Sequence, residues 1–242
     1  MIHPIRSFAK RLARHWPSAV LSRRRGARFI LHPQNWLDNR LLVGAPFEGA
    51  QIAAARAVIA ERNIDLVIDI GANIGLYTVL LGLMPQVSSV ICFEPVRRNF
   101  AQLMGNVFVN NLCEKVDAHR LALGAKNGAA VIYIDPNSTG VSRLELGTAA
   151  RHQGAFSKQE WIETAVFDDL VRYAGRRAFV KIDVEGGAAA VLRGMKNFLS
   201  SNDVVLQIEL SNTERMDALA MLDNAGYSIS REIDGDVIFT RR

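Results

Sequence analysis

Short apolar runs alternate with stretches of helical character along most of the chain. The apolar runs are rich in Val and Ile, which is typical of strands buried on both faces. They lie at residues 66–70, 90–93, 116–121, 179–183 and 204–210. Helices are predicted at residues 47–62, 74–84, 97–111, 188–199 and 214–225. Strands that alternate with helices predict a single doubly wound α/β domain with a mainly parallel sheet.

Two parts of the second half depart from this alternation. Residues 227–240 predict an antiparallel final hairpin, because two strand-like runs flank Asp234-Gly235, a dipeptide typical of tight turns. The region 122–166 reads as an insertion that carries loops. Its strand candidates at 131–134 and 162–166 flank a stretch rich in Ser, Thr, Gly and Asn.

The first 28 residues form a basic leader with eight Arg and Lys residues and no acidic residue. Apolar residues recur there at three- and four-residue steps until Pro17, which predicts an amphipathic helix. Such a helix can contact an anionic membrane surface, and the alternative is a terminal helix that packs on its own domain or is frayed. We therefore divide the chain into a leader and lead-in segment at 1–46 and a folded domain at 47–242.

Composition excludes several classes of protein. Outside the leader, 21 basic residues face 24 acidic ones, so a basic groove for nucleic acid is not expected. Cys92 and Cys113 form no CxxC pair, and the leader lacks a signal-peptide apolar run, which favours a cytoplasmic location. No apolar run is long enough to span a membrane. No His, Cys and Asp cluster has metal-ligand spacing, so no metal is predicted.

The strongest chemical signal is a Gly-rich turn that links the strand at 66–70 to the next helix. Gly71 and Gly75 allow a tight turn and a close approach of the backbone to a ligand, although an ordinary strand-to-helix turn looks similar. Glu94 follows the second strand, nineteen residues after Gly75, where a carboxylate can accept hydrogen bonds from ribose hydroxyls. Together these features predict a nucleoside-containing cofactor.

The turn itself separates two cofactors. It reads Gly71-Ala72-Asn73-Ile74-Gly75 and lacks the GxGxxG spacing that brings the backbone against a pyrophosphate. Asp69 places a negative charge where a pyrophosphate would be repelled and an ammonium group attracted. S-adenosylmethionine is therefore favoured over NAD.

Four segments resemble the FkbM family of methyltransferases over about residues 47–240. They are VIDIGANIGLYT, CFEPVRRNFAQLMGNVFVNN, KIDVEG with VLRGM, and QIEL. The resemblance implies a class I, S-adenosylmethionine-dependent methyltransferase domain at 47–242. It also implies transfer of a methyl group to a hydroxyl of a sugar, glycan or natural product. The residues implied to bind the cofactor are Asp69, Gly71, Asn73 and Gly75 for its methionine part, Glu94 for the ribose, and Ala122 and Leu123 for the adenine.

The KIDVEG segment supplies the catalytic hypothesis. Strand alternation places Lys181 and Asp183 on one face, near the end of a central parallel strand where α/β sheets bind ligands. We expect Asp183 to accept the hydroxyl proton or to orient the nucleophile, with Glu185 beside it. Lys181 is either the charge partner of Asp183 or, with a lowered pKa, the base. The alternative is a structural ion pair.

Other readings stay open at this point. Family members often carry an acidic residue shortly after the Glu-Gly of KIDVEG, whereas residues 187–190 here are Gly-Ala-Ala-Ala, which leaves a non-catalytic cofactor-binding protein possible. An RNA methyltransferase would share the cofactor site but would need a basic face. His152 and Glu209 are weaker candidates for the site, since a lone loop histidine is more often solvated and Glu209 could simply end its strand.

Overall fold

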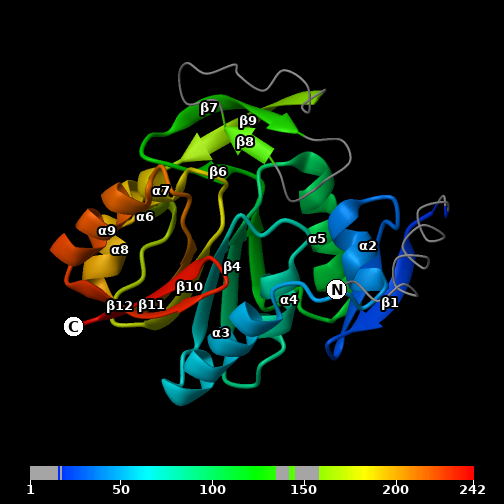
Figure 1. The fold of residues 1–242 in the computed structure, drawn as a ribbon, viewed down its shortest axis with the longest axis horizontal. Coiled ribbons are helices and arrows are strands. Elements are labelled where there is room, and N and C mark those ends of the chain that lie inside the picture. Colours follow the sequence, from blue (N-terminus) through cyan, green and yellow to red (C-terminus); the bar gives the residue numbers. More distant parts are fainter. Residues whose placement is uncertain (1–15, 17, 135–141, 145–157) are drawn as a thin grey trace.

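The computed structural model describes residues 16, 18–134, 142–144 and 158–242 (Figure 1). A seven-stranded sheet forms its centre, in the order β12-β13-β11-β10-β3-β4-β5. The strands are β3 (Leu66–Ile70), β4 (Ser89–Phe93), β5 (Val116–His119), β10 (Arg177–Ile182), β11 (Asp203–Glu209), β12 (Tyr227–Ile233) and β13 (Asp236–Arg241). Neighbours from β5 to β11 pair in parallel, and β13 pairs antiparallel with β11. The predicted doubly wound sheet with an antiparallel last strand is confirmed.

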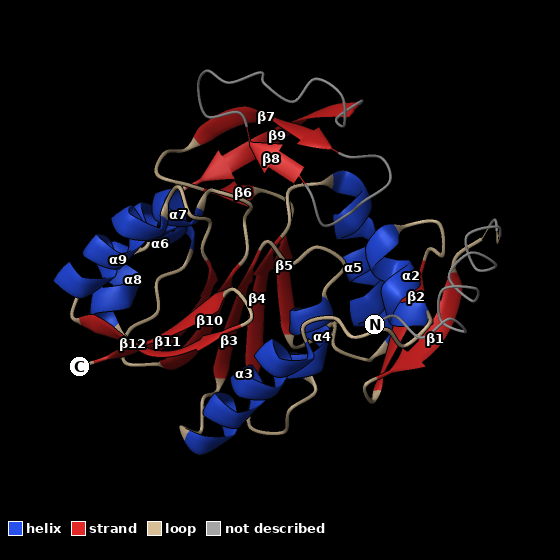
Figure 2. Ribbon diagram, in the orientation of Figure 1, coloured by secondary structure: helices blue, strands red, loops and turns tan. Residues whose placement is uncertain are grey.

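Helices cover both faces of this sheet (Figure 2). Those on one face are α3 (Gly49–Glu61), α4 (Leu76–Gly82) and α5 (Arg97–Val109), and those on the other are α6 (Phe167–Leu170), α7 (Ala188–Gly194), α8 (Lys196–Ser201) and α9 (Arg215–Asn224). Strand alternation divides the apolar core accordingly: Phe179 packs on the α4 side, and Val180 and Ile182 pack on the α7 side. The predicted placement of Lys181 opposite Val180 and Ile182 is therefore confirmed.

The single helix predicted over 188–199 is wrong, because α7 and α8 are separate helices. Gly194 ends α7 where the chain meets the Gly124 carbonyl, and a Cβ at Gly194 would lie 2.4 Å from that oxygen. Met195 follows with φ −124° and ψ 25°, which is outside helical geometry. This close tertiary contact breaks a segment whose local composition suits one helix.

The region expected to carry loops contains a second sheet. Its strands are β6 (Ala122–Leu123), β7 (Gly128–Ile134), β8 (Ser142–Leu144) and β9 (Lys158–Ala165), in the order β6-β9-β7-β8. This small sheet lies over the end of the main sheet at which β3 and β4 finish (Figure 1). Ile132, Ile134 and Ile162 form its own apolar cluster together with Val96 and Ala122. Most of the stretch at 137–142, and His152, lie outside the described residues.

The lead-in segment packs on the α5 side of the domain. It contains the hairpin β1 (Val20–Arg24) and β2 (Ala27–Leu31), followed by α2 (Trp36–Leu42). Phe29 and Leu31 are fully buried in the same apolar cluster as Leu103 of α5. The second half of the basic leader is thus a β-hairpin, whereas residues 1–15 of the predicted amphipathic helix lie outside the described residues. Among the described residues, no helix is long and apolar enough to span a membrane.

Candidate active site

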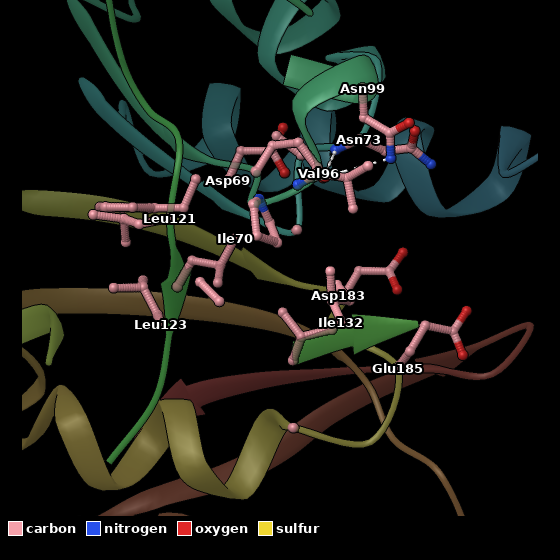
Figure 3. A pocket seen from close by; sticks show the side chains of 18 of the residues that line it. Asp69, Ile70, Asn73, Val96, Asn99, Leu121, Leu123, Ile132, Asp183 and Glu185 are labelled. Atoms are coloured by element: carbon pink, nitrogen blue, oxygen red, sulfur yellow. Dashed lines mark hydrogen bonds between the residues drawn. The ribbon is translucent and has the colours of Figure 1, made fainter. Parts of the chain in front are cut away.

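A cavity of about 1330 Å³ opens where the parallel strands of the main sheet end. The small sheet covers it through Ala130 and Ile132, of which Ile132 is labelled in Figure 3. Trp36 of the lead-in segment and Phe47, the first residue of the folded domain, also line it. Every predicted site residue that the structure describes lines this cavity, except Gly75, which is the N-cap of α4. We call the part around Asp69, Gly71, Asn73, Glu94 and residues 121–123 the turn end. The part around Glu48, Tyr77, Lys181, Asp183 and Glu209 is the lysine end.

Gly71 is fixed by its contacts with two strands. Its N–H and that of Ala72 both donate to the Phe93 carbonyl, at 2.9 and 3.0 Å. Its φ is +83°, and a Cβ here would lie 1.8 Å from the main-chain oxygen of Asp183. Only glycine suits this conformation and this separation. The Gly-rich turn therefore also joins the turn end to the lysine end.

Asp69 is buried beneath the turn, with 2% of its surface exposed. Its Oδ2 accepts hydrogen bonds from the main-chain N–H of Thr78 at 2.9 Å and from the Thr78 hydroxyl at 2.6 Å. Burial raises the pKa of Asp69 to about 6, although the bonds from Thr78 favour its charged form. Asp69 thus ties α4 to β3 and keeps a carboxylate close to the ligand space.

Glu94 and Asn73 meet at the turn end. Glu94 Oε2 accepts from the Asn73 main-chain N–H at 2.8 Å, and Oε1 accepts from Val96 N at 2.9 Å and from Asn99 Nδ2 at 3.3 Å. Burial raises the pKa of Glu94 to about 7. Asn73 has a left-handed backbone, and its side-chain oxygen is buried without a hydrogen-bond partner. An unsatisfied buried acceptor of this kind is suited to a ligand donor.

The far side of the turn end is apolar. Leu121, Ala122 and Leu123 line the cavity and are nearly fully buried. Figure 3 shows Leu121 and Leu123 on the side of the view away from the carboxylates of Asp183 and Glu185. Phe93 also lines this part and stacks on His119 at 5.1 Å between ring centroids. Such a surface suits a flat, weakly polar ring.

Lys181 is the centre of the lysine end, and only 2% of it is exposed. Its Nζ lies 3.0 Å from Asp236 Oδ2 and 3.8 Å from Asp183 Oδ2. Burial alone would lower the pKa of Lys181, but the charges of Asp183, Asp236 and Glu48 outweigh it and raise the pKa. Of its two predicted roles, the structure therefore favours the charge partner over a base with a lowered pKa.

Four residues that the sequence did not single out complete the lysine end. Gln207 Nε2 donates to Asp236 Oδ2 at 2.6 Å and to the Tyr77 hydroxyl at 3.2 Å. Tyr77 in turn makes a hydrogen bond that stabilises the charged form of Glu48. The one available sequence signal was Gln207, a polar residue inside the apolar run VVLQIEL. In the sequence, Glu48 lies at the start of a predicted helix and Asp236 lies in a predicted hairpin turn, so neither indicates a site.

Further carboxylates border the lysine end. Glu209 lines the cavity, and the charge of Asp183, followed by burial, raises the pKa of Glu209 to about 8. Glu185 is exposed at a left-handed φ of 42°, and its carboxylate points to the same side as that of Asp183 (Figure 3). Although residues 187–190 lack the acidic residue that family members often carry, Asp183, Glu185 and Glu209 still line the cavity. In the described part of the chain, no group of three His, Cys, Asp or Glu side chains is placed to hold a metal ion.

Solved structures and curated proteins resemble this chain. A crystal structure of methyltransferase FkbM from Methylobacillus flagellatus KT superposes with a TM-score of 0.53 and 18% identity, over 74% of this chain and 44% of that chain. The chain thus spans less than half of that protein, and the likeness shows the fold. Methyltransferase 1 of Beauveria bassiana is 26% identical over 183 residues, which cover 69% of this chain and 73% of that protein.

A second relative has a more specific name. The 31-O-demethyl-FK506 methyltransferase FkbM of Streptomyces tacrolimicus is 26% identical over 197 residues, which cover 70% of this chain and 75% of that protein. Residues 69–229 match the methyltransferase FkbM domain, and they include the Gly-rich turn, Glu94, Lys181 and Asp183. The match covers well over half of the chain, so this protein belongs to the FkbM methyltransferase family.

Proposed function

We propose that this protein is an S-adenosylmethionine-dependent O-methyltransferase that acts on a hydroxyl of a sugar, glycan or natural product. One observation carries the proposal: a single cavity joins a turn end suited to a nucleoside with a lysine end rich in ionisable groups. The two ends meet at the contact of Gly71 with Asp183. A methyl donor and an acceptor can thus lie in adjacent parts of the cavity, as group transfer requires.

The turn end fits the methyl donor. Three protein donors occupy Glu94, and a carboxylate has about four acceptor positions. A ribose with two hydroxyls would take the free position and displace the longest of these bonds, from Asn99 at 3.3 Å. Asp69 attracts an ammonium group, and residues 121–123 suit the adenine. When bound, S-adenosylmethionine supplies an electrophilic methyl group on a positively charged sulfur.

The lysine end would hold the acceptor. Asp183 lines the cavity next to Gly71 and can accept a hydrogen bond from a hydroxyl, either to orient it or to take its proton. Lys181 compensates the negative charge of Asp183 from a distance of 3.8 Å between Nζ and Oδ2. The name of the Streptomyces relative specifies O-methylation of a natural product, which supports a hydroxyl acceptor here.

The test begins with binding and continues with turnover. Calorimetric titration of the full chain with S-adenosylmethionine and with NAD should give binding of the first only. A screen with labelled methyl donor against polyols, glycans, natural products and RNA then identifies the acceptor class. Asp183→Asn should lower kcat by about 10²–10⁴-fold and change cofactor affinity little. Binding of NAD alone, or methyl transfer to RNA alone, would reject the proposal.

We also propose that the leader contacts an anionic membrane surface. Arg23 and Arg28 lie directly opposite each other across the β1–β2 hairpin, both exposed, and no ion pair joins either to a described residue. Facing like charges destabilise a hairpin unless an anion neutralises them. Leu21 is exposed on the same face. The four basic residues within 1–15 extend this positive region along the sequence.

A further inference from the structure

We propose that Glu48 is the catalytic base, and that Asp183 orients the acceptor hydroxyl without taking its proton. This inference rests on the proposed function. In the step, a lone pair of the hydroxyl oxygen forms a bond to the methyl carbon. The carbon–sulfur bond breaks with its electron pair kept by sulfur, which becomes a neutral thioether. The hydroxyl proton passes to a carboxylate oxygen of Glu48, and the product is a methyl ether.

The position of Glu48 makes it available to an acceptor. It lines the cavity together with Asp183 and Lys181, although it precedes the residues matched by the family domain. Its backbone is left-handed, with φ 47° and ψ 31°. Its carbonyl accepts the first bond of α3 from Ile52, and the preceding carbonyl of Phe47 accepts from Arg25. Strained non-glycine residues held by their surroundings are concentrated at functional sites.

Asp183 is held by the lysine at the centre of the lysine end. Lys181 Nζ lies 3.8 Å from Asp183 Oδ2, so this carboxylate is already engaged in an ion pair. An ion-paired carboxylate at a fixed place in the cavity is suited to hold and orient a hydroxyl. Lys181 makes its hydrogen bond to Asp236, and no ion pair joins Glu48 to a described residue. Glu48 is therefore the carboxylate that is free to take up the proton.

The charges around Glu48 favour the same assignment. Burial and the negative charges of Asp183 and Asp236 raise the pKa of Glu48 to about 7, against the opposing effects of Lys181 and Tyr77. A general base works best when its pKa is close to the working pH. Gln207 Nε2 donates to the Tyr77 hydroxyl at 3.2 Å and fixes its position. Tyr77 is therefore a positioning residue for Glu48.

The first measurement needs no acceptor or cofactor. Carboxyl ¹³C NMR of the full chain labelled at Glu should show a resonance that titrates near pH 7 and is lost in Glu48→Gln. Glu61→Gln is the matched control, because Glu61 is exposed at the other end of α3. Tyr77→Phe should move this titration to higher pH. If no titration above pH 6 disappears in Glu48→Gln, the assignment is wrong.

The second measurement is the pH profile of kcat with the acceptor found in the screen. Wild-type kcat should fall as the pH is lowered below about 7, the pKa of Glu48. Glu48→Gln should lower kcat by about 10²–10⁴-fold and remove this limb. Glu48→Asp should recover part of the rate, and Asp183→Asn should be slow but keep the limb. S-adenosylmethionine affinity should stay within about twofold in all variants, since they act on the acceptor.

The outcomes separate the two proposals. A wild-type protein that neither binds S-adenosylmethionine nor transfers a methyl group contradicts the proposed function, whatever Glu48 does. An active wild type whose limb survives in Glu48→Gln but disappears in Asp183→Asn returns the base to Asp183. A limb unchanged in both variants excludes both carboxylates as the base.

Discussion

At the turn end, protein hydrogen-bond donors hold the carboxylates, whereas at the lysine end the carboxylates face one another around a lysine. Asp69 is held by Thr78, and Glu94 by Asn73, Val96 and Asn99. Fixed donors of this kind stay in place whatever the charge of neighbouring groups. They give a pocket that is ready to bind before any ligand arrives.

At the lysine end, each charge depends on the others. Glu48, Asp183 and Asp236 all act on Lys181, and Asp183 raises the pKa of Glu209 to about 8. A change of charge at one of these groups therefore changes the electrostatics of the others. Glu94 and Glu48 both have a pKa raised to about 7, so what separates the two ends is the partners of each carboxylate: fixed donors suit binding, and mutually acting charges suit proton transfer.

The largest expected effect comes from breaking the contact between the two ends. Gly71→Ala would place Cβ 1.8 Å from the Asp183 carbonyl oxygen at a φ of +83°, so we expect loss of the folded protein. Circular dichroism and thermal unfolding measure this. Gly187→Ala is the control, because its Cβ would meet Val184 at 3.4 Å and its φ is −115°. A stable Gly71→Ala protein would show that the turn can separate from β10.

The next effect is expected from removal of the cation at the lysine end. Lys181→Met leaves Asp183 and Asp236 without their charge partner and should lower the free energy of unfolding by about 3–5 kcal/mol. The loss should be larger at pH 8 than at pH 6, because Glu48 and Glu209, whose pKa values are raised to about 7 and about 8, are protonated to a larger extent at the lower pH. Urea unfolding at both pH values tests this, with exposed Lys196→Met as control. An equal, small loss in both variants would contradict a coupled cluster.

A smaller effect is expected at the turn end. Glu94→Gln should weaken S-adenosylmethionine binding by about 2–3 kcal/mol, since charged hydrogen bonds to the ribose are lost. The pKa of Glu94 is raised to about 7, so wild-type affinity should increase from pH 6 to pH 8 as the carboxylate ionises. The same shift means that the unliganded protein loses stability as the pH rises from about 4.5 to about 7.

Calorimetry across this pH range measures the effect on binding. Glu163→Gln, an exposed substitution on β9, should keep both the affinity and its pH dependence. An unchanged dissociation constant in Glu94→Gln would remove the ribose assignment. A loss of affinity without any pH dependence would keep the assignment but contradict the raised pKa.

The smallest effect on the cavity is expected from the leader. Deletion of residues 1–15 should leave S-adenosylmethionine affinity within about twofold, because no described cavity residue precedes Gln34. A cut after residue 28 is unsuitable, because it removes β1 and shortens β2 beside the buried Phe29. The deletion should also bind anionic vesicles less well in co-sedimentation than the full chain does. Equal vesicle binding would reject the leader as the contact.

The sequence by itself determined the main sheet and the turn end. Local apolar patterns and glycine spacing predict the strand at 66–70, the turn to Gly75 and the position of Glu94 after β4. These features depend on residues that are neighbours in the sequence. The cavity collects them because the parallel strands all end at one edge of the sheet. The division of residues 188–199 into two helices could not be predicted, because it depends on a contact with the Gly124 carbonyl, seventy residues before Gly194.

The lysine end and the roof of the cavity were decided only by the tertiary structure. Tyr77 and Gln207 are separated by 130 residues, and no local pattern relates the two. Glu48 resembles an ordinary residue at the start of a helix until α3 packs on α4 and its Gln51 donates to the Asp234 carbonyl in the turn between β12 and β13. β7 and β9 become a sheet only by pairing with each other. Contacts between distant segments depend on how whole elements pack, which a single sequence does not show. A polar residue inside an apolar run, such as Gln207, is the one sign of such a contact that the sequence contains here.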